Sequence, residues 1–248
     1  MTTRKYLTIT RFLIVSLALV SILVKVSASP LTSIAPGLGS AESFAVLAGS
    51  TVTNTGPTLI DGNLGVEPGS AVTGFPPGMV LAPGTIHAAN AVALHAQNDV
   101  VTTYNTLAGL ACNENLTGQD LGGLTLTPGV YCFNSAVGLT GVLTLNAQGN
   151  PNAVFVFKIG TTLTTASNAQ VIVINSDNQA CNVAVNNVFW AVGTSATLGT
   201  GTAFAGNLIA FTSNTLTTKA SVSGRVIALG GAVTLDTNKI STVCQRRR

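Results

Sequence analysis

The sequence predicts a mainly β protein, a β-solenoid with one long α-helix packed alongside it. The first observation behind this prediction is a Thr-Leu pair that recurs at intervals of 19, 18, 35, 18 and 19 residues. The pairs begin at Thr125, Thr144, Thr162, Thr197, Thr215 and Thr234. A fixed period of this size, in residues that favour strands and are separated by Gly, is typical of stacked β-coils. The second observation is that residues 86–110 are the only stretch after residue 28 that reads as a helix.

The two residues of each pair point to opposite faces of their strand. The Leu side chains can therefore stack inward while the Thr side chains form an outer surface. The interval of 35 residues is nearly double the others, so this coil carries an insertion or hides a further strand. The insertion lies between Thr165 and Thr197, and it contains an apolar run at residues 171–174 followed by a polar loop.

Residues 1–28 have the features of a signal peptide. Basic residues precede an apolar run at residues 12–24, and the sequence Val-Ser-Ala at residues 26–28 has the form of a signal-peptidase site. The apolar run is 13 residues long, whereas a membrane-spanning helix needs about 20 residues. The sequence therefore predicts a secreted, extracellular protein without stable membrane insertion, and a short linker at residues 29–37.

The charge of the chain changes when residues 1–28 are removed. Seven basic residues then stand against eight acidic ones, which gives a net charge of −1, and three of the seven are the terminal Arg246, Arg247 and Arg248. A nucleic-acid partner is not expected, because it requires a clustered basic face. Only 8% of the residues are charged, so Ser, Thr, Asn and Gly must cover the outside.

Four cysteines, Cys112, Cys132, Cys181 and Cys244, follow the signal peptide. In an oxidising compartment disulfides are the expected state, and the spacings match no compact metal motif. Three pairings are possible. We favour Cys112 with Cys132, between a helix end and a strand, and Cys181 with Cys244, between the insertion and the last coil.

The elements follow in order along the chain. Residues 38–84 are short strand-like pieces separated by turn sequences such as Asn-Thr-Gly-Pro at residues 54–57. Residues 86–110 contain no Pro, and small residues at helical spacing form a narrow face that can lie close against a sheet. Both histidines, His87 and His95, fall on this helix about 80° apart, so they do not form an i, i+4 metal pair.

From residue 124 onward each coil has an apolar strand, a turn and a Thr-Leu pair. The apolar strands lie at residues 130–133, 154–157, 188–192, 208–211 and 226–229. The inward half of their side chains should form the core. One solenoid domain is therefore expected at residues 38–244, followed by a basic tail at residues 245–248.

A catalytic site is not expected, and neither is a metal or a cofactor. With two histidines on one helix and the cysteines oxidised, nucleophile and metal constellations are hard to assemble. No two of the eight acidic residues occupy equivalent positions in successive coils, where a sugar-cleaving site would gather them. Asp61, Asp120 and Asp177 instead lie in turn sequences.

The regular Thr array is the feature with a functional geometry. Coils stack about 4.7–4.9 Å apart, and residues i and i+2 lie about 6.6 Å apart along a strand, so the Thr hydroxyl and methyl groups would form a grid that can order water. A second column follows the pairs by three positions, at Thr165, Thr200, Thr218 and Thr237. Strand propensity and cross-strand Thr pairs also explain a bare Thr repeat.

Several dispersed motifs, in the same order along the chain, resemble the secreted microbial ice-binding protein family. They lie at residues 44–56, 62–66, 72–78, 126–131, 152–157 and 187–193. The resemblance implies an irregular right-handed β-solenoid of triangular cross-section with one long helix alongside, and adsorption to an ice crystal surface through a flat face.

The family often carries the motif Thr-Ala/Gly-x-Thr/Asn on that face. Residues 165–168 match this motif fully, and residues 200–203 match it in part. In the later coils Lys219 and Lys239 interrupt the pattern. Together with the two Thr columns, the resemblance implies the following ice-binding residues: Thr162, Thr164, Thr165, Asn168, Thr197, Thr200, Thr202, Thr215, Thr217, Thr218, Thr234 and Thr237.

The predicted function is therefore that of a secreted, monomeric ice-binding protein, which adsorbs to ice and inhibits its growth or recrystallisation. The alternative is an adhesion or envelope-matrix protein that uses the same fold without ice activity. The basic tail at residues 246–248 favours this alternative, because it could contact anionic surfaces.

Overall fold

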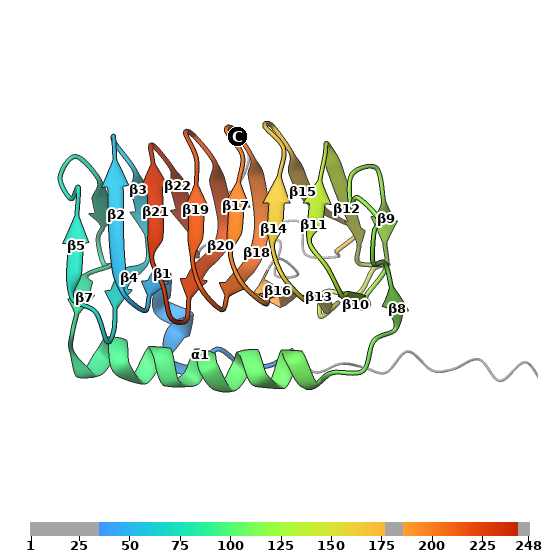
Figure 1. Cartoon of the computed structure of the whole chain (residues 1–248), viewed down its shortest axis with the longest axis horizontal. Helices are drawn as coiled ribbons and strands as arrows, with labels where there is room; N and C mark the ends of the chain where they lie inside the picture. The colour runs from blue at the N-terminus through green and yellow to red at the C-terminus, as the bar shows by residue number, and fades with distance from the viewer. Residues whose placement is uncertain (1–34, 177–185, 243–248) are drawn as a thin grey trace, which may run out of the picture. The chain divides into compact units, whose positions relative to one another are not determined.

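The structure, a computed structural model, describes residues 35–176 and 186–242. It consists of parallel strands in two sheets, a short 3-10 helix η1 (Gly39–Ser43) and one long helix α1 (Ala91–Gly109). The strands wind in successive coils and α1 runs beside them, as Figure 1 shows. The predicted mainly β fold with one helix alongside is confirmed.

Several expectations concern residues outside the described part of the chain. They are the signal peptide at residues 1–28, the disulfide between Cys181 and Cys244, and the basic tail at residues 245–248. Within the described residues, no helix has the length and hydrophobicity that crossing a membrane requires.

Sheet B forms one face of the coil stack and is turned toward the viewer in Figure 1. Its seven strands, in pairing order, are β11 (Val137–Leu139), β14 (Leu163–Thr165), β17 (Ala196–Leu198), β19 (Asn214–Leu216), β21 (Val233–Asp236), β2 (Thr51–Thr55) and β5 (Ala71–Thr73). Successive side chains of a strand point to opposite faces, so each strand buries one set of residues and exposes the other.

Sheet A covers the two other faces of the stack. Its strands next to α1, which we call the helix face, are β8 (Glu114–Asn115), β10 (Gly129–Phe133), β13 (Phe155–Ile159), β16 (Val188–Val192), β1 (Phe44–Ala48), β4 (Asn63–Val66) and β7 (Ile86–Ala88). The strands of the remaining face, the third face, are β9 (Thr125–Leu126), β12 (Val142–Asn146), β15 (Gln170–Ile174), β22 (Lys239–Ser241), β3 (Leu59–Asp61) and β6 (Met79–Leu81).

Two long strands, β18 (Ala203–Ala210) and β20 (Ser221–Ala228), belong to both faces of sheet A. They turn at Gly206 and Gly224, which pair with each other and have φ angles of 111° and 137°. A Cβ atom on Gly224 would lie 2.1 Å from the carbonyl oxygen of Gly206. Only glycine fits this corner, because the coils approach closely and the backbone is left-handed.

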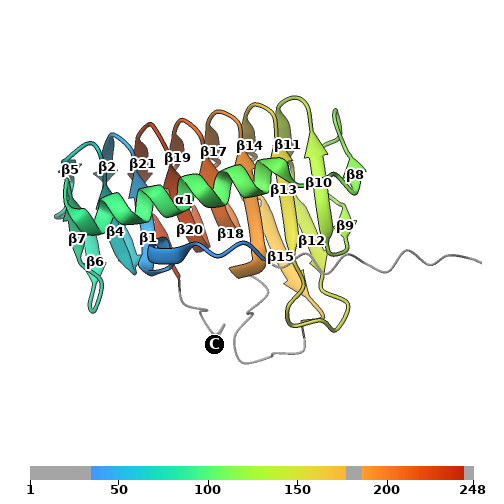
Figure 2. The same ribbon diagram turned by 90° about the horizontal axis from the view of Figure 1, so that it is seen from below.

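The first three and the last three described strands meet inside the stack. Strand β1 pairs with β20, β2 with β21 and β3 with β22. In Figure 1 the blue N-terminal strands therefore lie directly beside the red C-terminal ones. Helix α1 then carries the chain to the opposite end, where β8 and β9 begin the second set of coils (Figure 2).

Apolar side chains from all three faces fill the interior of the coils. Aromatic rings form a column through it: Phe157 stacks on Trp190 with ring centroids 3.9 Å apart, and Tyr131 and Phe204 lie at the two ends of this pair. The indole of Trp190 is fully buried and donates to the carbonyl of Ala205 at 3.0 Å. The stacking ties neighbouring coils together.

The inner strands of the helix face, β1, β10, β13 and β16, are buried on both sides, which is more than the predicted inward half. Their outer side chains, such as Val156, Phe189 and Ile209, pack against Ala96 and Val100 of α1. The helix face can be apolar throughout because α1 shields it from water, as in other parallel sheets covered by helices. Figure 2 shows α1 lying along this face.

The predicted helix of residues 86–110 begins too early. Residues 86–88 form strand β7, which pairs with β4, and α1 begins only at Ala91. Ala89 has a φ of 48°, and the side chain of Asn90 accepts a hydrogen bond from the amide of Ala93 at 3.0 Å. This cap starts the helix, so His87 lies on a strand and the prediction that both histidines share the helix is wrong.

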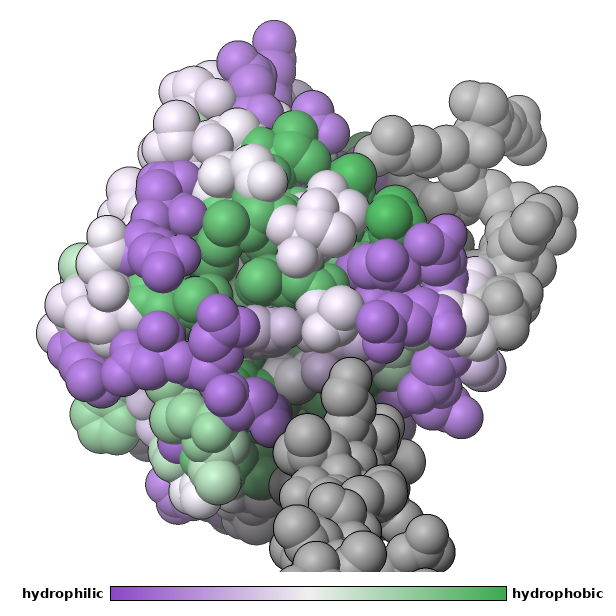
Figure 3. Space-filling view, turned by 90° about the vertical axis from the view of Figure 1, so that its right-hand side faces the viewer, coloured by the Kyte–Doolittle hydropathy of each residue, from purple (hydrophilic) through white to green (hydrophobic). Residues whose placement is uncertain are grey.

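The predicted disulfide between Cys112 and Cys132 is confirmed, with Cα atoms 5.8 Å apart. It fastens the segment after α1 to strand β10 of the helix face. This end of the stack is seen in Figure 3, where an apolar patch is surrounded by hydrophilic residues.

Candidate functional site

The outer surface of sheet B carries a continuous row of threonines. Strand register places one residue of each strand in this row, and in pairing order these residues are Gly138, Thr164, Thr197, Thr215, Thr234, Thr53 and Thr73. Neighbouring strands lie about 4.7–4.9 Å apart. Six consecutive coils therefore present a Thr hydroxyl and methyl group at one regular spacing.

A second outward row lies two residues further along each strand. In this row Asp236 of β21 stands opposite Thr55 of β2, and Thr217 follows one residue after the end of β19. The row from Gly138 to Thr73 is called the main row. A third row lies two residues before it along each strand and contains Thr162 and Thr51. We call the outward residues of these three rows the threonine face.

The side chains of the threonine face are small. Besides threonine, the outward positions of sheet B carry glycine, alanine and serine, and Asp236 is the one charged residue among the outward strand residues that the structure describes. Backbone ladders on both sides hold the five inner strands, and the packed interior supports all seven. The face is therefore a rigid array with few long side chains.

Not every Thr-Leu pair contributes to this face. The pairs at Thr125 and Thr144 lie on β9 and β12 of sheet A, on the third face. Thr164, rather than Thr162, stands opposite Thr197. The sequence repeat therefore counts residues per coil but does not give the position of each pair around the coil.

Two of the predicted ice-binding residues point inward instead of outward. Thr165 and Thr202 are 2% and 0% exposed, and their hydroxyls share a hydrogen bond of 2.8 Å. The amide of Gly199 donates to the Thr165 hydroxyl, and the Thr202 hydroxyl reaches the carbonyl of Ala166. These threonines fill the interior of a corner, so placing them on the exposed face was wrong.

Four further predicted residues lie at the corner between sheet B and the third face. Asn168 and Thr237 occupy left-handed backbone positions with φ of 59° and 55°. Thr200 is exposed and lies 3.4 Å from the hydroxyl of Thr217. Thr218 is half-buried and donates to the carboxylate of Asp236. These residues border the threonine face but do not belong to its rows.

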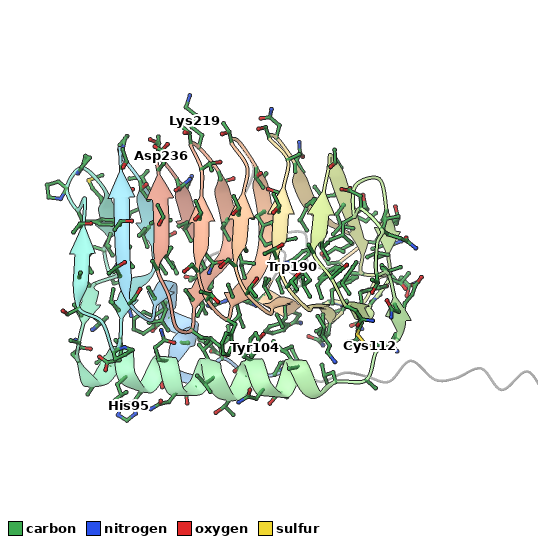
Figure 4. All side chains as sticks on the ribbon, viewed as in Figure 1. His95, Tyr104, Cys112, Trp190, Lys219 and Asp236 are labelled. Atoms are coloured by element: carbon green, nitrogen blue, oxygen red, sulfur yellow. A yellow bond between two sulfur atoms is a disulfide. The ribbon has the colours of Figure 1, made fainter. Side chains whose placement is uncertain are left out.

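Neither of the two interrupting lysines lies in the rows of the threonine face. Lys219 is exposed at the corner, with a φ of 62°, and its side chain extends away from the end of the strands in Figure 4. Lys239 lies on β22 of the third face, opposite Leu59. Their ammonium groups therefore leave the rows of threonines clear.

The sequence repeat missed the N-terminal part of the face. Thr51, Thr53, Thr55 and Thr73 extend its rows beyond β21, although none of them is followed by Leu. The signal available in the sequence is the alternation Thr51-Val52-Thr53, with a small apolar residue between two threonines. It could not show that β2 pairs with β21, some 180 positions later in the chain.

In the described part of the chain, histidine, cysteine and acidic side chains nowhere gather in groups of three that could hold a metal ion. The threonine face offers hydroxyl donors and acceptors beside methyl groups on a fixed lattice. Such an array suits a repetitive, hydrogen-bonding surface better than a small molecule, which needs a concave pocket.

The comparisons with known proteins agree with this geometry. Residues 46–241 match the Ice-binding-like family. An ice-binding protein of Nostoc sp. (strain HG1) is 57% identical over 208 residues, which is 84% of this chain and 74% of that protein.

Two crystal structures of ice-binding proteins have a similar fold. One comes from an Antarctic biological consortium, with a TM-score of 0.77 and 42% identity over 83% of this chain and 90% of that one. The other comes from the Antarctic ascomycete Antarctomyces psychrotrophicus, with a TM-score of 0.78 and 39% identity over 84% of this chain and 98% of that one. The protein described here is accordingly a member of the Ice-binding-like family.

Proposed function

We propose that this protein is secreted and binds ice through the threonine face. The observation that carries the proposal is the row of six threonines on adjacent strands of sheet B, from Thr164 to Thr73. Membership of the Ice-binding-like family and the names of its relatives support ice as the ligand. The N-terminal signal sequence supports secretion.

The mechanism follows from the spacing and the rigidity of the face. Threonines repeat about 4.7–4.9 Å across the strands and about 6.6 Å along them, so water molecules bound to their hydroxyls are held at fixed positions, and the methyl groups restrict the water between them. Because the strands are already ordered, little conformational entropy is lost when the face adsorbs. Adsorption at many such points blocks the addition of further water to the crystal.

The proposal is tested by placing one bulky side chain in the middle of the row. Thr215 lies between Thr197 and Thr234, and a Thr215→Tyr variant would lift the protein away from a crystal surface. The matched control is Ser223→Tyr, which adds the same ring at an exposed outward position of the third face.

Ice growth and recrystallisation are measured under a microscope with the oxidised chain lacking residues 1–28. We expect the wild type and Ser223→Tyr to arrest or facet ice crystals, and Thr215→Tyr to lose most of this activity at an unchanged melting temperature. Equal activity of the two tyrosine variants would place the binding surface elsewhere. A folded wild type without any effect on ice would refute the proposal and favour an adhesion or matrix role.

A further inference from the structure

The threonine face carries one charged residue, at the end of strand β21. Strands β21 and β2 each place two residues in the main and second rows, and next to them lie Thr215 of β19 and Thr217, one residue beyond the end of that strand. Five of these six positions are threonine, namely Thr215, Thr217, Thr234, Thr53 and Thr55, and the sixth is Asp236. Asp236 is therefore the one charged residue in a group that is otherwise threonine, and it stands opposite Thr55 of β2.

The carboxylate of Asp236 is held in place by the corner residues. The hydroxyl of Thr218 donates to Oδ2 at 2.5 Å, and the hydroxyl of Thr237 donates to Oδ1 at 3.0 Å. The side chain is half-buried and lies at the end of β21, as Figure 4 shows. The charge is thus fixed at the edge of the rows and cannot fold away from a bound surface.

The turn after β21 explains why an acid occupies this position. Thr215 pairs with Thr234, while the amide of Lys219 bonds to the carbonyl of Asp236, so Lys219 stands opposite Thr237. The turn after β21 is therefore one residue shorter than the turn after β19. The carboxylate reaches across the gap to Thr218, and a threonine side chain is too short to accept both hydroxyls.

We propose that Asp236 braces this short turn at the expense of ice adsorption, and that its charge limits the activity of the threonine face. An ionised carboxylate binds its hydration water strongly, and withdrawing that water is costly unless a cation or several donors replace it. An ice surface offers no cation. Water around Asp236 is therefore oriented by the charge, while water around the neighbouring threonines is free to take lattice positions.

This inference rests on the proposed function and concerns the strength of the same site. It is tested with the variants Asp236→Thr, which completes the six-threonine grid, and Asp236→Asn, which removes the charge and keeps a side-chain oxygen for the turn. The control is Glu114→Thr on β8 of the helix face, which changes the net charge equally at an exposed position away from sheet B.

The thermal hysteresis gap is measured at equal molar concentration, together with the melting temperature of each variant. We expect a rise on the order of twofold for Asp236→Thr, a smaller rise for Asp236→Asn and no change for Glu114→Thr, since only the first two relieve desolvation at the face. The melting temperature of both Asp236 variants should fall, because Asp236→Thr loses both carboxylate acceptors of the turn and Asp236→Asn keeps only one of them.

Unchanged or lower hysteresis in a folded Asp236→Thr would overturn the inference and make the carboxylate part of the binding surface. If that variant does not fold, Asp236→Asn decides in the same way. The failure of this inference can be told apart from the failure of the proposed function. If the wild type is active and Asp236→Thr is no more active, the role of Asp236 is refuted. If the wild type is inactive, ice binding itself is refuted, and this inference with it.

Discussion

Arg225 is placed to join the N-terminal coils to the C-terminal ones. Its side chain lies on β20, is only 7% exposed, and donates to the carbonyl of Glu42 through Nε and Nη2 at 3.2 and 2.7 Å. Nη1 donates to Oδ1 of Asn207 on β18 at 2.9 Å. One guanidinium thus links η1 at the start of the domain to two strands of the later coils.

The cost of losing this side chain can be worked out from its contacts. An Arg225→Met substitution fills similar space but leaves the Glu42 carbonyl and the Asn207 side-chain oxygen without their donor. A buried acceptor left unsatisfied costs about 1–3 kcal/mol. The bond to Asn207 is buried, whereas the bonds to the Glu42 carbonyl are part-buried, so the two together cost at most about 6 kcal/mol. Burial lowers the pKa of Arg225 against the opposing influence of Glu42, and removing the buried charge recovers part of its desolvation cost. We expect a net loss of about 2–4 kcal/mol.

Urea unfolding, followed by circular dichroism, measures this loss. The matched control is Lys158→Met. Lys158 also donates from its side chain to a carbonyl, that of Leu110, and this is its one side-chain bond among the described residues. Its loss should cost about 1 kcal/mol. An Arg225→Met variant as stable as the wild type, or no less stable than Lys158→Met, would show that strand pairing alone holds the two ends together.

Two further predictions concern stability. Replacing Cys112 and Cys132 together by Ser should lower the unfolding free energy by about 3 kcal/mol, because the bond closes a loop between residues 20 positions apart; a melting temperature equal to that of the oxidised wild type would contradict this. Partial desolvation raises the pKa of Asp120, but hydrogen bonds from Thr140 and Gly122 outweigh it and hold the pKa below its ordinary 3.8. The ionised Asp120 therefore contributes to the unfolding free energy above pH 3.8, and this contribution is lost as the pH falls through the lower pKa of the folded state. The difference in unfolding free energy between the wild type and Asp120→Asn should narrow as the pH is lowered. A difference that stays constant with pH would refute this role of the Asp120 carboxylate.

The parts of the fold that the sequence predicted correctly depend on local patterns. The Thr-Leu period reports the number of residues per coil, and the alternation within each strand reports which side chains turn inward. Both are properties of a few neighbouring residues. The disulfide between Cys112 and Cys132 could also be predicted, because it joins the end of the predicted helix to a predicted strand that follows it in the chain.

The errors share a different cause. Residues 86–90 were read as helix because they continue an alanine-rich segment, but pairing of β7 with β4 overrides that propensity. Thr165 and Thr202 follow the spacing of a surface motif, yet their hydroxyls satisfy each other inside a corner. In both cases a contact with a neighbouring coil decides the structure, and that contact is invisible in the local sequence.

The same distinction explains why the threonine face was only partly predicted. A solenoid face is defined by strand register, and register is set wherever two coils touch, whatever their separation along the chain. Here the face continues from Thr234 on β21 to Thr53 on β2, which are joined only by pairing of the two chain ends. The length of the face therefore depends on the junction that Arg225 bridges. A variant that opens this junction should shorten the row of threonines from six coils to four, Thr164 to Thr234, and reduce ice activity without altering any residue of the face.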